Sequence, residues 1–386
     1  MSVCYTLTKR NYIGENALDD ALDIVKQRAY GKALIVTDEG LVKIGLVDHL
    51  KEHLDKHGIE HVVYAKVQPN PTMDQVHEGL EVYRHENCSF IIAFGGGSAM
   101  DCAKGINVLT VNEGRIIDYK VGGKVIQGPL SPFVCITTTA GTASEVTSFA
   151  VITDTSTKTK FIVIDELIMA DITVVDPHIM KNLPPFITAC TGMDALTHAV
   201  EAFVATGSNP ATDCNAMGAI DLIFKHLPEA CQPEHEIECR EFMAYAQFMA
   251  GIAFNTAGLG IVHAMAHQIG GTHNLAHGLC NAVILPYVVE YNALHSEEAR
   301  AKYAFIAREM FFVGPHERGT KAAMALVENI KKLSRQVGIP ENFKEYNFTK
   351  EDAQIWTDKA FEDPCMPFNP VKPSREDILN LYLSLI

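Results

Sequence analysis

The feature that most constrains the fold of this chain is a change of pattern at Asn182-Leu183-Pro184-Pro185. Before it, short apolar runs such as Ala33–Thr37 alternate with segments of helical periodicity. This alternation is typical of βαβ units and of a parallel sheet covered on both faces. After it, strand signals almost vanish and long helical runs follow one another. We therefore expect an α/β domain with a parallel sheet over residues 1–184 and an all-helical domain over residues 185–386.

The same patterns place the individual elements. Strands are expected at Ala33–Thr37, Val62–Tyr64, Ser89–Phe94, Phe133–Ile136 and Asp171–Val175, and a hairpin at Ala150–Thr153 and Phe161–Ile164. Helices are expected over about 41–57, over 72–86 and from about Ala99. The helical runs of the second half cover 186–205, 211–227, 236–257, 259–270, 279–293, 297–311, 318–337, 350–361 and 374–385.

Composition limits the class of protein and its partners. The chain has 386 residues, of which 47% are apolar and 20% charged, which is enough for two domains and a substantial core. Its formal net charge of −15 argues against nucleic acid and anionic membranes as partners. The ten cysteines form no CxxC pair, and the N-terminus has no apolar signal segment. We therefore expect a cytoplasmic protein with reduced thiols.

One uncharged segment has the length of a membrane-spanning helix. Phe242–Val262 carries no formal charge over 21 residues, which is long enough to cross a bilayer. It contains Gln247 and Asn255, however, and it ends at a pair of histidines. The expected structure is a helix, or two short helices, buried in a large core, and no membrane contact is expected.

Two apolar helical segments each carry ionisable side chains on one face. His263 and His267 are four residues apart, and Asp194 and His198 repeat that spacing. Side chains at i and i+4 lie on the same helix face, about 5–6 Å apart at Cβ. His277 follows, next to Gly278. A hydrogen-bonded core position explains any single one of the 16 histidines, but it explains this combination poorly.

Carboxylate and imidazole together favour a divalent first-row metal such as Fe(II) or Zn(II). The set contains no cysteine, which argues against a structural zinc site.

Two loops at strand ends have the composition of phosphate-binding loops. Gly95-Gly96-Gly97-Ser98 lies between a strand and a helix, where backbone N–H groups can approach an anion. It lacks the G-x-G-x-x-G spacing, and Ser98 with Asp101 resembles a capping box with Asp in place of Glu. Thr137–Glu145 follows the next strand with a cluster of hydroxyl groups. A plain tight turn and a loop that caps its own helix are the alternatives, but two such loops in one sheet favour a nucleotide.

Two further polar residues lie at strand ends on the same side. Asp38 ends the first predicted strand, where its carboxylate can accept hydrogen bonds from a ribose diol and would repel a 2′-phosphate. NAD is therefore expected rather than NADP. Asn70, in Pro69-Asn70-Pro71-Thr72, is a rigid polar turn that either starts a helix only or also lies on the rim of the nucleotide site.

These residues resemble the iron-containing (group III) alcohol dehydrogenases along essentially the whole chain, most closely the lactaldehyde reductase and 1,3-propanediol dehydrogenase branch. The most specific match is Gly260–Gly278, close to the signature G-x-x-H-x-x-A-H-x-x-G-x(5)-P-H-G. Ala276 departs from the signature proline, Ala99-Met100 departs from a common Pro-His or Pro-Gln, and Asn369-Pro370-Val371-Lys372 lacks the usual arginine. None of these departures removes a residue needed for the chemistry.

The resemblance implies a set of roles. Asp194, His198, His263 and His277 would hold Fe(II), with Zn(II) as an alternative, and His267 would lie near the nicotinamide as a proton relay. The residues that would contact NAD(H) are Asp38, Asn70, Gly97, Ser98, Thr138, Thr139, Thr142, Val151 and Lys160. The fold would be an N-terminal dinucleotide-binding domain followed by a helical metal-binding catalytic domain, as in the dehydroquinate synthase-like group. A homodimer or larger homo-oligomer is expected.

The expected reaction is hydride transfer between the nicotinamide and a short-chain primary alcohol or aldehyde. Phe149 and Phe254, placed next to the Thr-rich loop and before the histidine helix, are candidates for lining a small apolar substrate pocket. A metal-dependent hydrolase is disfavoured because Ala264 stands where an H-E-x-x-H helix needs its glutamate. A lyase that uses NAD transiently, a specialised anionic or diol substrate, and an inactive nucleotide-binding module stay as alternatives.

Overall fold

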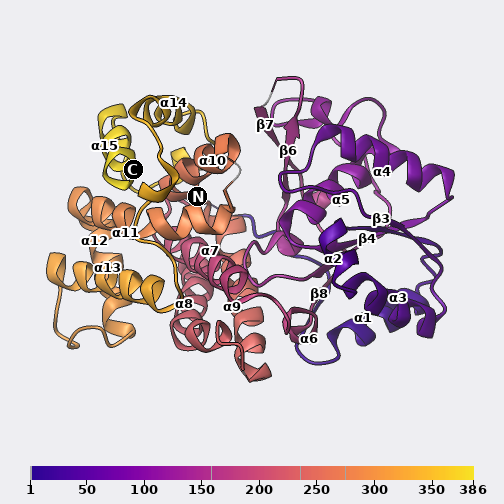
Figure 1. The fold of residues 1–386 in the computed structure, drawn as a ribbon, viewed down its shortest axis with the longest axis horizontal. Helices are drawn as coiled ribbons and strands as arrows, with labels where there is room; N and C mark the ends of the chain where they lie inside the picture. Colours follow the sequence, from indigo (N-terminus) through magenta and orange to yellow (C-terminus); the bar gives the residue numbers. More distant parts are fainter. Residues whose placement is uncertain (1, 158, 235, 274) are drawn as a thin grey trace. The chain divides into compact units, whose positions relative to one another are not determined.

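The computed structural model describes residues 2–157, 159–234, 236–273 and 275–386. The chain divides into two units, Met1–Asn182 and Leu183–Ile386, close to the boundary expected at residues 184 and 185. In Figure 1 the strands carry the indigo and magenta colours of the first unit, while the orange and yellow end of the chain is helical.

A parallel sheet organises the first unit. Among the residues described, six strands pair in the order β1-β8-β5-β4-β2-β3, and every pairing is parallel. The strands are β1 (Asn11–Ile13), β2 (Ala33–Val36), β3 (His61–Tyr64), β4 (Phe90–Gly95), β5 (Phe133–Thr137) and β8 (Ile172–Val175). From β2 the chain moves outward to β3, whereas β4 and β5 lie on the other side of β2. The strand order therefore reverses between β2 and β4.

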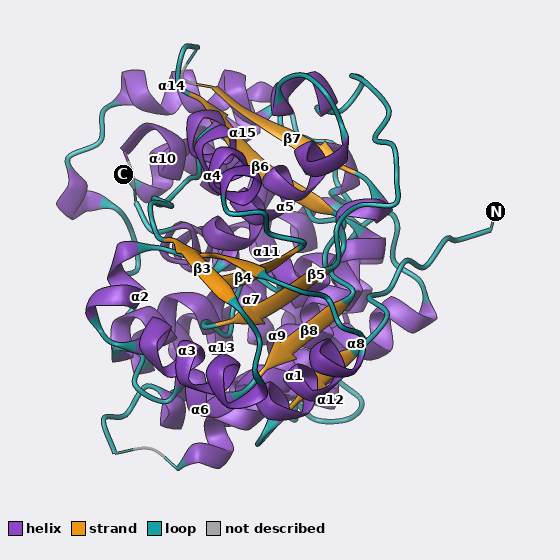
Figure 2. Cartoon of the chain, turned by 90° about the vertical axis from the view of Figure 1, so that its right-hand side faces the viewer, coloured by secondary structure: helices purple, strands orange, loops and turns teal. Residues whose placement is uncertain are grey.

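Alternate residues of each strand face different helices, because successive side chains of a strand point to opposite faces. Leu34 and Val36 belong to one buried cluster with residues of α4 (Met73–His85) and α5 (Gly97–Val111). Ala33 and Ile35 belong to the cluster formed by α1 (Ala17–Gln27) and α3 (Leu46–His57). Figure 2 shows these two helix layers on opposite sides of the orange strands. The expected α/β class is confirmed.

The predicted hairpin is also present. β6 (Phe149–Asp154) and β7 (Thr159–Ile164) pair antiparallel, with Ala150 opposite Val163, and form a separate two-stranded sheet within the described residues. β8 follows it and returns to the large sheet.

Two details of the first unit differ from the sequence-based expectations. The helix expected over 41–57 is two helices, α2 (Glu39–Lys43) and α3, because Gly45 adopts φ 79° and breaks the chain direction. β1 and α1 were not predicted from the pattern, and β1 is only three residues long. A short edge strand of this kind gives too little periodicity to be recognised.

In the described residues of the second unit, the regular secondary structure is helical, as expected. They are α7 (Pro185–Val204), α8 (Pro210–Ala230), α9 (Ile237–Ala257), α10 (Ile261–His273), α11 (His277–His295), α12 (Glu297–Glu309), α13 (Gly319–Gln336), α14 (Lys350–Ala360) and α15 (Arg375–Leu385). A four-residue helix, α6 (Pro177–Met180), ends the first unit. Within the described ranges, no single helix is long and apolar enough to cross a membrane. The pair α9 and α10 passes that criterion together, but it is bent by 105°.

The centre of the sheet provides a test of the fold. Ile92 in β4 is fully buried, so we expect Ile92→Ala to lower the free energy of unfolding by about 2–5 kcal/mol. Urea denaturation followed by circular dichroism measures this change. Fluorescence of Trp356, the only tryptophan and a residue of the second unit, provides an internal reference.

The matched control is Ile44→Ala, the same substitution at a position that is 66% exposed in the first unit. We expect it to change the free energy of unfolding by less than about 0.5 kcal/mol. Equal effects of the two substitutions would contradict the assignment of β4 to the core of the sheet.

Candidate functional site

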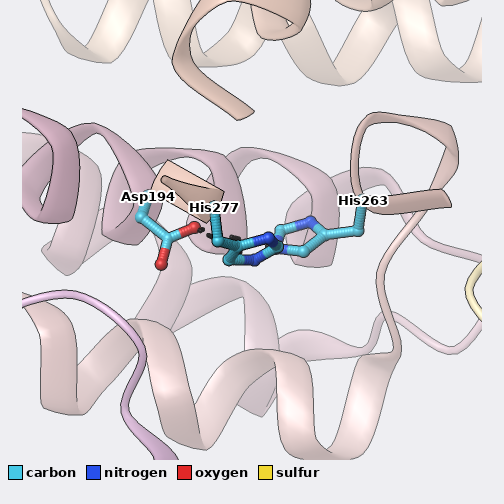
Figure 3. A group of neighbouring side chains, drawn as sticks. All are labelled: Asp194, His263 and His277. Carbon is cyan, nitrogen blue, oxygen red and sulfur yellow. Dashed lines mark ion pairs between the residues drawn. The ribbon is translucent and has the colours of Figure 1, made fainter. Parts of the chain in front are cut away.

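Three of the predicted metal ligands converge in the second unit. Asp194 lies on α7, His263 on α10 and His277 at the start of α11, and one donor atom of each lies within 4.8 Å of the others. The Asp194 Oδ1 atom is 3.9 Å from Nε2 of His263 and 3.6 Å from Nε2 of His277. Figure 3 shows the three side chains approaching one another from separate elements. Asp194 and His263 are buried, whereas the His277 side chain is 39% exposed.

The surroundings of this group show that a divalent cation fits it. The Nδ2 atom of Asn281 lies 2.7 Å from Asp194 Oδ1, 3.0 Å from His263 Nε2 and 3.1 Å from His277 Nε2. An amide nitrogen has only two hydrogens and cannot donate to three acceptors at once. A metal ion can accept lone pairs from a carboxylate and two imidazoles together. The donor set therefore suits a metal better than it suits the amide alone.

His263 has the protonation state that a ligand requires. Burial lowers its pKa well below the ordinary value, and the neighbouring His198, His277 and His267 lower it further. The imidazole is therefore neutral near pH 7, as metal ligation needs. Its Nδ1 atom lies 2.6 Å from Oε2 of Glu201, which leaves Nε2 as the atom facing the metal group.

His198, the fourth predicted ligand, lies beside the group. It is one turn after Asp194 on α7, and its ring stacks on His263 at 4.7 Å and on Phe254 at 4.2 Å between centroids. Phe254 is therefore in contact with a predicted ligand. Phe149 belongs to the first unit, where its carbonyl accepts a hydrogen bond from Lys104. The ligand role of His198 and the pocket role of both phenylalanines stay predictions.

His267 lies outside the three-residue ligand group. Its ring stacks on His277 at 5.2 Å, and its Nδ1 atom lies 2.8 Å from Oδ2 of Asp363. Burial raises the pKa of Asp363, but the charge and hydrogen bond of His267 and the N–H of Cys365 outweigh burial, so the pKa falls below its ordinary value. A carboxylate therefore orients the ring, as the proposed relay role would need.

Sequence reasoning did not identify Glu201, Asn281 or Asp363. Glu201 follows His198 by three residues and Asn281 follows His277 by four, so helical spacing was a usable signal for both. Asp363 lies 96 residues from His267, and no local pattern joins them. Burial raises the pKa of Glu201 to about 8, although backbone N–H groups of Val262, Gly260 and His263 lower it.

Gly278 explains the His-Gly pair. A Cβ atom at this position would lie 2.3 Å from the carbonyl oxygen of Cys190 and 3.2 Å from Cβ of Asp194. Only glycine lets the start of α11 approach α7 this closely. The approach brings His277 and Asp194 together.

Six of the nine predicted NAD contacts lie at one edge of the sheet, whereas Val151 and Lys160 lie on the separate hairpin and Asn70 lies before α4. Asp38, Gly97 with Ser98, and Thr138–Thr142 follow the carboxyl ends of β2, β4 and β5, which are neighbours in the sheet. This edge includes the point where the strand order reverses, and α/β sheets bind ligands there. Gly96 and Gly97 also face the second loop, because Cβ atoms on them would lie 3.3 Å from Thr139 and Thr142 respectively.

The edge fits a bound anion. Gly96 is the N-cap of α5 and supplies no side-chain bond, and the first turn carries no acidic residue. Backbone N–H groups at the helix start are thus available to a phosphate. Among the described residues, the buried Oγ1 of Thr139 has no hydrogen-bond partner. A dinucleotide can satisfy both kinds of donor.

The expected capping box of Ser98 and Asp101 is wrong. α5 begins at Gly97, so Ser98 already lies within the helix. Asp101 instead accepts hydrogen bonds from Oγ of Ser144 and the N–H of Val151. The buried ammonium of Lys104 adds bonds to the Ser144 and Phe149 carbonyls, so α5 holds the Thr-rich loop and the start of β6 in place.

Asp38 and Asn70 already have hydrogen-bond partners within the protein. The Oδ1 atom of Asp38 accepts the N–H of Leu41 and caps α2. Asn70 accepts a hydrogen bond from Nζ of Lys160 at 2.8 Å, in front of the capping box of Thr72 and Gln75 that starts α4. The roles of these residues in cofactor binding stay predictions.

Comparison with known proteins assigns the family. Residues 8–177 match the iron-containing alcohol dehydrogenases, and residues 188–386 match the C-terminal part of the Fe-containing alcohol dehydrogenase family. The NAD-dependent methanol dehydrogenase of Bacillus methanolicus is 42% identical, covering 96% of each chain. The 1,3-propanediol dehydrogenase of Citrobacter freundii is 41% identical over 98% of this chain and 97% of its own. A crystal structure of 1,3-propanediol oxidoreductase is 39% identical and superimposes over all of both chains with a TM-score of 0.94.

The fold and these matches define an oxidoreductase. The chain belongs to the iron-containing alcohol dehydrogenase family, as the sequence resemblance implied. It is an NAD-linked, metal-dependent alcohol dehydrogenase or aldehyde reductase.

The close approach at Gly278 generates a prediction. We expect Gly278→Ala to push α11 away from α7, to weaken metal binding, and to cost about 1–3 kcal/mol of stability through overpacking. Metal content after dialysis and urea denaturation measure the two effects. Gly314→Ala is the control, because a Cβ at Gly314 meets nothing within 4 Å. Normal metal retention by Gly278→Ala would refute the role of this contact.

Proposed function

We propose that Asp194, His198, His263 and His277 hold Fe(II) and that the enzyme interconverts short-chain primary alcohols and aldehydes with NAD(H). The convergence of Asp194, His263 and His277 within 4.8 Å carries this proposal. The proposed set of one carboxylate and three imidazoles suits a divalent first-row metal such as Fe(II). Zn(II) is the alternative metal for the same donors.

When bound, the metal would supply Lewis acidity, and the nicotinamide would supply the hydride chemistry. The protein orients them and moves the proton. Asp363 holds the Nδ1–H of His267, so Nε2 of His267 is the atom that takes or returns the alcohol proton. Phe254 is buried against His198, where its ring would favour small apolar substrate groups next to the metal ligands.

Several observations support the finer assignments. The carboxylate of Asp38 at the end of β2 favours NAD over NADP, since it would repel a 2′-phosphate. Gly97, Ser98, Thr138, Thr139, Thr142, Val151, Asn70 and Lys160 complete the proposed NAD contacts. Relatives named for methanol and 1,3-propanediol favour short substrates. All ten cysteines are free thiols, which suits the proposed cytoplasmic location.

Turnover tests the metal site directly. With NADH, Fe(II) and a panel of short neutral and anionic aldehydes, we expect metal-dependent loss of absorbance at 340 nm. His263→Ala should lower the rate by at least about a hundredfold, because Lewis-acid stabilisation is worth several kcal/mol. His316→Ala, the same change at an exposed histidine of the second unit, is the control. Full activity of His263→Ala would contradict the proposed metal site. Protein that binds metal but oxidises no NADH would favour the lyase alternative.

Metal exchange tests the identity of the ion. After removal of metal by a chelator, we expect activity to disappear and to return more fully with Fe(II), under anaerobic conditions, than with Zn(II). Each metal is added at one equivalent, and its content is measured alongside the rate. A higher rate with Zn(II) at equal occupancy would show that zinc is the working metal.

A further inference from the structure

Two of the three histidines of α10, His263 and His267, are bound through Nδ1 to a carboxylate from elsewhere in the second unit. Glu201 Oε2 lies 2.6 Å from Nδ1 of His263, and Asp363 Oδ2 lies 2.8 Å from Nδ1 of His267. Glu201 comes from α7, and Asp363 comes from the segment after α14. The two pairs are chemically alike, but only His263 belongs to the group with Asp194 and His277.

Glu201 uses its two oxygens for two different contacts. Oε1 accepts the N–H of Val262 at 2.7 Å, while Oε2 holds the His263 ring. Val262 lies in the first turn of α10, whose N–H groups have no acceptor within the helix. A Cβ at Gly260 would lie 2.8 Å from Oε1, so glycine at this position lets the carboxylate reach the helix start.

We propose that Glu201 is a positioning residue of the metal site: it keeps the proton of His263 on Nδ1 and so leaves the Nε2 lone pair for the metal. The proposal rests on the metal-binding role given above for His263. The side chains of Glu201 and His263 are only 5% and 2% exposed, so water competes little for Nδ1. Carboxylates that accept the second N–H of a ligating histidine set both its tautomer and its orientation.

The amide variant Glu201→Gln separates this role from a packing role. The glutamine oxygen can keep the bond to the Val262 N–H, and the NH₂ group then faces Nδ1 of His263. An NH₂ group donates to Nδ1, which moves the ring proton to Nε2 and removes the lone pair that binds metal. The shape of the side chain and the bond at the helix start are retained.

Asp363→Asn is the matched control on the same helix. The two oxygens of Asp363 also have different partners. Oδ1 accepts the N–H of Cys365 at 2.9 Å, and Oδ2 lies next to Nδ1 of His267. The amide therefore makes the same change to the ring of His267, which lies outside the three-residue ligand group. Its affinity for the first equivalent of Zn(II) is expected to stay at the wild-type value, while its turnover falls. His267, Asp363 and Cys365 form a second group of possible ligands, so only later equivalents should respond to this change.

The experiment is a competition titration of Zn(II) against a chromogenic chelator for wild type, Glu201→Gln and Asp363→Asn. We expect the affinity of Glu201→Gln to fall by about 10–100-fold and that of Asp363→Asn to be unchanged. Thermal unfolding of the metal-free proteins checks that both variants are folded. NADH oxidation by wild type with Fe(II) is measured in parallel.

A second measurement does not depend on how Glu201→Gln and Asp363→Asn fold. Nitrogen-15 NMR of histidine-labelled, metal-free wild type at pH 9, where Glu201 with its pKa of about 8 is ionised, reports which ring nitrogen of His263 carries the proton, and a His263→Asn variant assigns the signal. We expect Nδ1 to carry it.

Three results would overturn the inference. They are wild-type affinity in folded Glu201→Gln, an equal loss of affinity in Asp363→Asn, and a proton on Nε2 of His263 in wild type. A wild-type protein that binds no Zn(II) and oxidises no NADH would instead refute the proposed function, and the inference with it.

Discussion

The stability of the second unit depends on interaction partners for the ionisable side chains that its helices bury. Asp194, Glu201 and His263 have side chains no more than 5% exposed, in the interior of the helical unit. An unpaired buried charge costs several kcal/mol, so each group needs a partner. Glu201 pairs with His263, while Asp194 and the free face of His263 point to a shared position that suits a metal. The same contacts that remove the cost of burial therefore assemble the site.

A comparable arrangement holds the nucleotide edge of the first unit. Lys104 is fully buried, and burial lowers its pKa, yet its Nζ atom donates to oxygens of Ser144, Thr147 and Phe149. Asp101, one turn earlier, binds Ser144 and Val151. These two side chains connect α5 to the loop after β5 and to the hairpin. The glycines at the start of α5 can then lie against Thr139 and Thr142.

The accuracy of sequence-based prediction followed the strength of the local pattern. The strands β2, β4 and β5 are short runs buried at every position, and the second unit has long helical runs; the positions of both were predicted to within a few residues. β1 is too short to show a period, and Gly45 divided a helix that the pattern left continuous. Ser98 and Asp101 have the spacing of a capping box, but Asp101 forms long-range bonds to Ser144 and Val151 instead. Local spacing therefore identified Asp101 as a hydrogen-bonding residue, but it did not identify the partners of Asp101.

By itself, the sequence determined the two-part architecture and the residues with the right chemistry. Helical spacing on apolar segments singles out Asp194, His198, His263 and His267, because side chains four residues apart share a helix face whatever the rest of the chain does. Only the tertiary structure decided which histidine joins which group. Glu201 meets His263 across 62 residues and Asp363 meets His267 across 96. Such pairings arise from the packing of helices against one another, and no local period of the sequence records them.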